Sequence, residues 1–168
     1  MNFCASVCAA AALLAGTVAH AATNIADPEQ FVRDVNAKFQ KDPDNYTEPD
    51  DVYTPRLAAL FAADRADGEK GGGVGRLDWD AWVNGQAVNL KDVAVSSRRD
   101  EFRSDRRIVT ATMTNFGKPA RVYFYFERLN GRWLIDDIRW PGPDGWTLSL
   151  VLKYGSDFVP NPDKRYPY

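Results

Sequence analysis

The stretch VYFYFERLNGRWLIDDI, residues 122–138, decides the fold. Valine and phenylalanine side chains alternate with tyrosines along residues 122–126. A second run of β-branched and aromatic residues follows at 133–138. A period of two is typical of a β-strand. Asn130 and Gly131 lie between the runs, and both residue types accept the positive φ that a two-residue hairpin turn requires. The sequence therefore predicts an antiparallel hairpin here.

Further strands are predicted on the N-terminal side of this hairpin. Val93 and Val95 alternate with polar neighbours, and residues 108–113 form another run of β-prone side chains. The sequence Phe116-Gly117-Lys118-Pro119 is typical of a turn. Together with the hairpin, these segments predict four consecutive antiparallel strands.

Two helices are predicted before the strands. Asp27 is suited to the N-cap of the first helix and Pro28 to its first position, while Pro43 ends it. The second helix follows Tyr53-Thr54-Pro55 and has an apolar face, and residues 67–75 form a flexible glycine-rich linker after it. Helices followed by strands predict an α+β domain whose helices cover one face of the sheet.

The chain ends in a short helix and a tail. Residues 146–152 are predicted to form the closing helix, and residues 153–168 an extended proline-rich tail. We expect one folded domain over residues 22–152, because 147 residues remain after the signal described next and suit a single core.

Residues 1–21 are typical of a secretory signal. The apolar run is too short to span a membrane, and Ala19-His20-Ala21 places small residues where a signal peptidase cleaves. Cleavage after Ala21 predicts a protein of the periplasm or the secreted fraction without a membrane anchor. An uncleaved hydrophobic terminus is the alternative, since this segment contains no lysine or arginine.

Cleavage would also remove Cys4, Cys8 and His20, which are the only cysteines and histidine of the chain. The mature protein then has no thiolate nucleophile, no imidazole base and no disulfide. We therefore predict no metal site of the usual zinc type and no cofactor.

The charge of the chain is balanced. It has 21 basic and 23 acidic side chains, a net charge of −2. The run of arginines at residues 98–107 is interleaved with acidic residues, which predicts a solvated hairpin loop. Because nucleic-acid binding requires a clustered basic excess, we predict no nucleic-acid partner.

A segment rich in functional groups lies at residues 78–86. Its candidates for binding a ligand or partner are Asp78, Asp80, Trp82, Asn84 and Gln86. The spacing of the oxygen ligands does not fit a calcium-binding EF-hand loop. A structural interpretation competes with the binding one, in which Trp79 and Trp82 are core residues, the aspartates cap a turn, and Asn84-Gly85 forms a tight turn.

Asp136 and Asp137 lie within the last predicted strand. Adjacent side chains of a regular strand point to opposite faces, so we expect only one of the two carboxylates to face any one site. An inward carboxylate requires a partner, and the candidates are Arg121, Arg132 and Arg139. Alternatively, it is a pocket acid with a raised pKa, suited to general base catalysis.

Arg121, Tyr123 and Tyr125 share one face of their strand, opposite three apolar side chains. Tyrosine buries a large area at low entropic cost, so this face is a candidate surface for a partner. Packing within the domain explains the tyrosines equally well.

Three segments resemble secreted bacterial proteins of the DUF3828 type, a family of unknown function: residues 53–60, 77–86 and 133–139. The resemblance spans roughly Phe31 to Leu152. It implies the nuclear transport factor 2-like, or cystatin-like, α+β cone, in which helices pack into a curved four-stranded antiparallel sheet. The open end of that cone often holds a pocket. The resemblance implies no catalytic residues, and the fold alone does not specify function.

These observations favour a non-enzymatic envelope domain that binds a partner protein or a small ligand, as a monomer or homodimer. One alternative is a hydrolase or isomerase that pairs Asp78 or Asp80 with Asp136 or Asp137 at the mouth of the cone. A second alternative is an inhibitor or immunity-type protein that blocks another enzyme.

Overall fold

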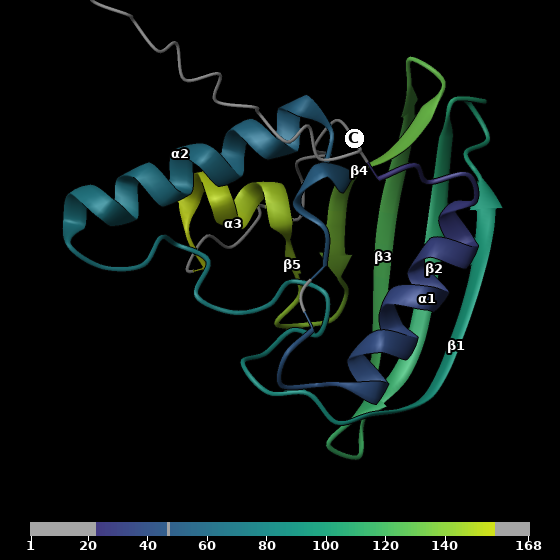
Figure 1. Ribbon diagram of the computed structural model, residues 1–168, viewed down its shortest axis with the longest axis horizontal. Helices are drawn as coiled ribbons and strands as arrows, with labels where there is room; N and C mark the ends of the chain where they lie inside the picture. The colour runs from purple at the N-terminus through teal and green to yellow at the C-terminus, as the bar shows by residue number, and fades with distance from the viewer. Residues whose placement is uncertain (1–22, 47, 157–168) are drawn as a thin grey trace, which may run out of the picture.

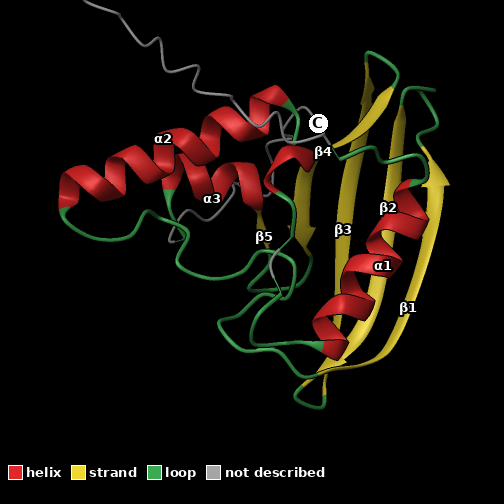
Figure 2. Cartoon of the chain, viewed as in Figure 1, coloured by secondary structure: helices red, strands yellow, loops and turns green. Residues whose placement is uncertain are grey.

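The computed structural model describes residues 23–46 and 48–156. The predicted signal peptide and residues 157–168 of the predicted tail therefore lie outside the described residues. Figures 1 and 2 show an α+β fold with one sheet. Its elements are α1 (Pro28–Lys41), the short 3₁₀ helix η1 (Asp50–Val52), α2 (Pro55–Gly71), β1 (Leu90–Arg99), β2 (Arg106–Asn115), β3 (Lys118–Leu129), β4 (Arg132–Trp140), β5 (Trp146–Thr147) and α3 (Leu148–Tyr154).

The sheet is antiparallel and has the strand order β1-β2-β3-β4-β5. The prediction of four strands was wrong by one, because Trp146 and Thr147 pair with Trp140 and Arg139 as a two-residue fifth strand. A turn over residues 141–145 returns the chain to β4, and Gly145 donates a backbone hydrogen bond to Gly142 within it. The closing helix consequently begins at Leu148 rather than at residue 146.

The predicted turns at Asn130-Gly131 and at Phe116-Gly117 are confirmed. Asn130 and Gly131 have φ values of 51° and 83°, and Leu129 pairs with Arg132 across that turn. Phe116 and Gly117 have φ values of 49° and 75° between β2 and β3. Positive φ at both central positions matches the right-handed twist of the flanking strands.

The start of α1 is also as predicted. The Asp27 carboxylate accepts hydrogen bonds from the backbone N–H of Glu29 and Gln30, so it caps the helix. Val32, Val35 and Phe39 face the core. Phe31 is half-buried and packs against that core.

Helix α2 is longer than predicted, and Thr54 caps its N-terminus. It continues to Gly71, so the first half of the predicted flexible linker is helical. The buried Asp64 carboxylate accepts a hydrogen bond of 2.7 Å from the backbone N–H of Arg76. This contact holds the loop after α2 against the helix.

The helices lie in two places. Helix α1 packs on β1 and β2, and α2 and α3 pack together beside β4 (Figure 1). One continuous core joins them and includes Val35, Leu57, Val109, Phe124 and Leu148. Within the described residues, no helix is both long and apolar enough to cross a membrane.

Candidate functional site

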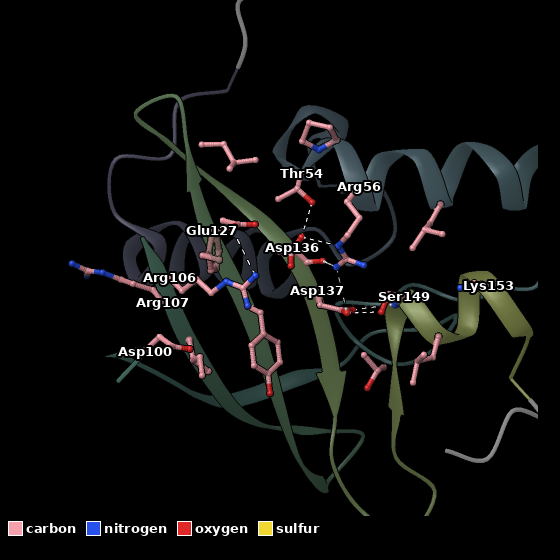
Figure 3. Close-up of a pocket in the computed structure, with 18 of the residues that line it drawn as sticks. Thr54, Arg56, Asp100, Arg106, Arg107, Glu127, Asp136, Asp137, Ser149 and Lys153 are labelled. Atoms are coloured by element: carbon pink, nitrogen blue, oxygen red, sulfur yellow. Dashed lines mark hydrogen bonds and ion pairs between the residues drawn. The ribbon is translucent and has the colours of Figure 1, made fainter. Parts of the chain in front are cut away.

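A pocket of about 1250 Å³ lies on the face of the sheet opposite α1, which we call the outer face (Figure 3). Its floor consists mostly of outer-face side chains of β1 to β4, and its far wall comes from the first turn of α2 and from α3. The described lining includes Thr54, Arg56, Leu60, Arg98, Asp100, Arg106, Arg107, Ile108, Tyr125, Glu127, Asp136, Asp137, Ser149, Leu150, Lys153 and Tyr154.

A β-bulge in β4 shapes this site. Tyr125 of β3 pairs with Asp137, whereas the next residue, Phe126, pairs with Ile135, so Asp136 is the extra residue in β4. Ile135 and Ile138 therefore both face the core, where each is fully buried. The bulge thus interrupts the regular alternation of the strand at the two aspartates.

The expectation that only one of these aspartates faces a given site was wrong. Arg56, in the first turn of α2, contacts both carboxylates: its Nε lies 3.0 Å from Asp136 Oδ1 and its Nη2 lies 3.6 Å from Asp137 Oδ2 (Figure 3). The Thr54 hydroxyl also donates to Asp136 Oδ1, at 2.9 Å. The bulge permits this arrangement, because it places consecutive side chains toward the same neighbour.

The predicted arginine partners were wrong as well. The partner of both aspartates is Arg56, while Arg132 donates to the carbonyl oxygen of Thr23 at 2.8 Å and lies 4.0 Å from Asp51. Arg121 and Arg139 are exposed on their strands. A local strand pattern does not reveal Arg56, because 80 residues separate it from Asp136.

Asp137 is the most enclosed acid of the pocket, with an exposed fraction of 5%. Its Oδ1 accepts backbone hydrogen bonds from Ile138 and Ser149, both of 3.0 Å. The Ser149 hydroxyl donates to Oδ2 at 2.5 Å. Burial raises the pKa of Asp137, and the hydrogen bonds from Ser149 and the charge of Arg56 oppose that rise. The carboxylate thereby ties the first turn of α3 to β4.

The acids on the opposite side of the pocket are also held by donors of the chain. Glu127 Oε1 lies 2.7 Å from Arg103 Nη2 and 3.7 Å from Arg106 Nη2. Asp100 Oδ1 accepts backbone hydrogen bonds from Phe102 and Arg103. All four carboxylates of the described lining are thus fixed by contacts within the protein.

Three of the sequence-predicted site residues line this pocket, namely Tyr125, Asp136 and Asp137. Arg121 and Tyr123 occupy the same face of β3, as predicted, because Val122 between them is fully buried on the other face. Neither Arg121 nor Tyr123 is among the described residues that line the pocket.

The candidates at residues 78–86 lie elsewhere, in the loop before β1. Trp82 is a core residue, and the Asp80 carboxylate accepts a hydrogen bond of 2.7 Å from its backbone N–H. Asn84 Oδ1 accepts from Trp146 Nε1 at 2.9 Å, and Gln86 Nε2 donates to the carbonyl oxygen of Asp78 at 3.1 Å. These contacts match the structural interpretation of the segment.

The tight turn in this loop is confirmed. Asn84 has a φ of 53°, and Asp80 and Gly85 exchange backbone hydrogen bonds across the turn. Trp79, the other predicted core indole, is half-buried and packs edge-on against Trp146.

A second group of polar residues, next to Asp80, was not predicted from the sequence. Trp82 Nε1 donates to Tyr53 Oη at 3.2 Å, and Tyr53 Oη donates to Glu48 Oε1 at 3.1 Å. Burial raises the pKa of Glu48, and the charge of Asp80 raises it further. Burial also raises the pKa of Asp80. The group forms through tertiary contacts, so residue spacing alone does not show it.

Most residues of the pocket were likewise not predicted as site residues, among them Thr54, Arg56, Glu127 and Ser149. In the sequence, Thr54 indicates only the start of a helix. Nothing in its neighbours indicates that its hydroxyl also contacts Asp136. Within residues 23–46 and 48–156, no three histidine, cysteine, aspartate or glutamate side chains are grouped to hold a metal ion.

We compared the chain with protein-family models, with curated proteins and with solved structures, and none of the three comparisons found a match. The function must therefore be inferred from the residues of the pocket.

Proposed function

We propose that this protein is a non-enzymatic binding domain of the cell envelope, and that its pocket on the outer face holds a small ligand or a segment of a partner protein. This proposal rests on one observation: arginines of the protein hold carboxylates of the pocket in place. Asp136 and Asp137 are held by Arg56, and Glu127 by Arg103 and Arg106. Preorganised polar groups around an apolar patch are typical of ligand sites.

A carboxylate-dependent hydrolase or isomerase is the second candidate, because Asp137 is an enclosed acid with a raised pKa. Its two oxygens already accept hydrogen bonds from Ser149 and Ile138, so proton transfer to a substrate would have to break those contacts. This favours binding over catalysis. Of the four acids that the sequence suggested for an enzyme, only Asp136 and Asp137 are among the described lining residues.

We further propose that the sheet curves into the cone that the family resemblance implies. Two irregularities support this: the bulge in β4 and a register shift in β1 between Lys91 and Ala94. Bulges bend a strand and increase its twist. We also propose secretion with cleavage after Ala21, which N-terminal sequencing of the mature protein tests.

Hydrogen exchange tests the binding proposal. The protein is isolated gently from the envelope of the cells that produce it, and half of the sample is unfolded and refolded to release any ligand. We expect slower exchange in the isolated sample at the first turn of α2 and in α3, because both form the pocket wall. Slower exchange confined to residues 78–86 would instead favour a site in that loop.

A further inference from the structure

The outer face carries a row of four side chains that crosses the sheet through the pocket. Arg98 of β1 pairs with Ile108 of β2, Ile108 pairs with Tyr125 of β3, and Tyr125 pairs with Asp137 of β4. All four line the pocket. With strands about 4.8 Å apart, the row is about 14 Å long from Arg98 to Asp137.

The middle of this row is apolar and its two ends differ in charge. Ile108 and the ring of Tyr125 form the centre, and Leu60 and Leu150 of the helices face the same pocket. At the β4 end, Arg56 contacts the carboxylates of both Asp136 and Asp137. At the β1 end, the side chain of Arg98 has neither a hydrogen bond nor an ion pair within the described part of the chain.

No acid of the lining forms an ion pair with Arg98 among the described residues. The described lining contains five basic side chains and four acidic ones. Asp100, the residue after β1, accepts hydrogen bonds from the backbone of its own turn, and Glu127 contacts Arg103 and Arg106. The guanidinium of Arg107 lies over the Trp133 ring at 5.5 Å, and the Lys153 ammonium lies over the Tyr154 ring at 5.0 Å.

From this row, and resting on the proposed binding function, we infer that the ligand is an elongated organic anion, with an apolar body across Ile108 and Tyr125 and a carboxylate or similar group at Arg98. A guanidinium binds a carboxylate through two parallel hydrogen bonds. An apolar floor between charged ends suits a molecule of about 10 to 14 Å, given the spacing of the strands.

Matched probes of opposite charge test this inference. Decanoate and decylammonium have the same apolar chain, and calorimetric titration measures the affinity of the full mature protein for each. We expect decanoate to bind about tenfold more tightly, since a hydrogen bond between a guanidinium and a carboxylate is worth about this factor. The preference should shrink as the salt concentration rises.

Two variants and a control locate the anionic group. Arg98→Gln should weaken decanoate binding about tenfold, while Arg98→Lys should keep most of the affinity because it keeps the charge. Arg121→Gln should bind as the wild type does, because Arg121 is exposed on the same face but lies beyond the described lining.

Three outcomes would overturn the inference: equal affinity for the two probes, an unchanged affinity after Arg98→Gln, or no decanoate binding at millimolar concentration. None of these would by itself remove the proposed binding function, because hydrogen exchange on the isolated protein tests that function without a chosen probe.

Discussion

Arg56 Nε lies 3.0 Å from Asp136 Oδ1, although 80 residues separate them in the chain. The contact joins the first turn of α2 to the bulge of β4, and the same guanidinium reaches Asp137. One side chain therefore fixes the position of both carboxylates and of the helix that forms the wall of the pocket.

Replacing Arg56 by methionine should destabilise the protein by about 1 to 2 kcal/mol, because it leaves the nearly buried Asp137 without its cationic neighbour. The loss stays modest because Arg56 itself is half exposed, so solvent screens its charge. Urea unfolding measures the change. Arg65→Met, at an exposed position of the same helix, is the control, and an equal effect of both variants would contradict the role of Arg56.

Ser149→Ala should cost about 1 to 2 kcal/mol, because it removes the hydroxyl donor to the enclosed Asp137. It should also raise the pKa of Asp137 further, since a hydrogen bond to the charged form is lost. Carboxyl NMR titration reports that pKa. Ser149→Thr keeps a hydroxyl and should restore the wild-type value. A pKa that stays unchanged in the alanine variant would show that the hydroxyl does not interact with the carboxylate.

The turn between β3 and β4 should be sensitive to a side chain at Gly131, whose φ is 83°. Gly131→Ala should destabilise the protein by about 1 kcal/mol, the usual cost of alanine in the left-handed region. Gly73→Ala is a matched control. A Cβ meets no atom within 4 Å at either glycine, but the φ of Gly73 does not lie in the left-handed region. Thermal unfolding compares the two variants, and equal midpoints would argue against the hairpin geometry.

This hairpin also shows which features the sequence alone predicts well. The turn at Asn130 and the cap at Asp27 depend on residues adjacent in the chain, and both predictions were confirmed. The alternation of β3 was likewise confirmed, because the pleat requires it.

The features that were not predicted depend on residues distant in the chain. The bulge at Asp136 arises from the pairing of β4 with β3, and no residue near Asp136 marks it. Arg56 and Ser149 approach the aspartates only when α2 and α3 pack beside β4. Periodicity describes one element at a time, so it cannot assign a contact among three elements.

The pH dependence of stability should reveal the group formed by Glu48, Tyr53 and Asp80. Burial raises the pKa of Glu48 above its unfolded value of about 4.3. The folded state therefore binds the proton more tightly. The stability contributed by this group is complete below the unfolded pKa and is lost as pH rises through the folded one. Asp80 and Asp50 lie near enough to add to this effect by repulsion.

Glu48→Gln removes this titration and keeps an acceptor for the Tyr53 hydroxyl. Relative to the wild type, the variant should therefore be more stable at pH 7 than at pH 4. Urea unfolding at the two pH values measures the difference. Glu69→Gln on α2, whose carboxyl is exposed, is the control. A difference that is the same at both pH values would contradict the raised pKa.

Native mass spectrometry of the gently isolated protein, compared with a Leu150→Trp variant whose larger side chain narrows the pocket, tests the central claim most directly. Leu150 is half-buried in the pocket lining, so the indole should occupy ligand space. We predict a reproducible added mass on the wild type that is absent from a folded variant. A bare wild-type protein, or an added mass that persists in the variant, would contradict the assignment of the pocket as the binding site.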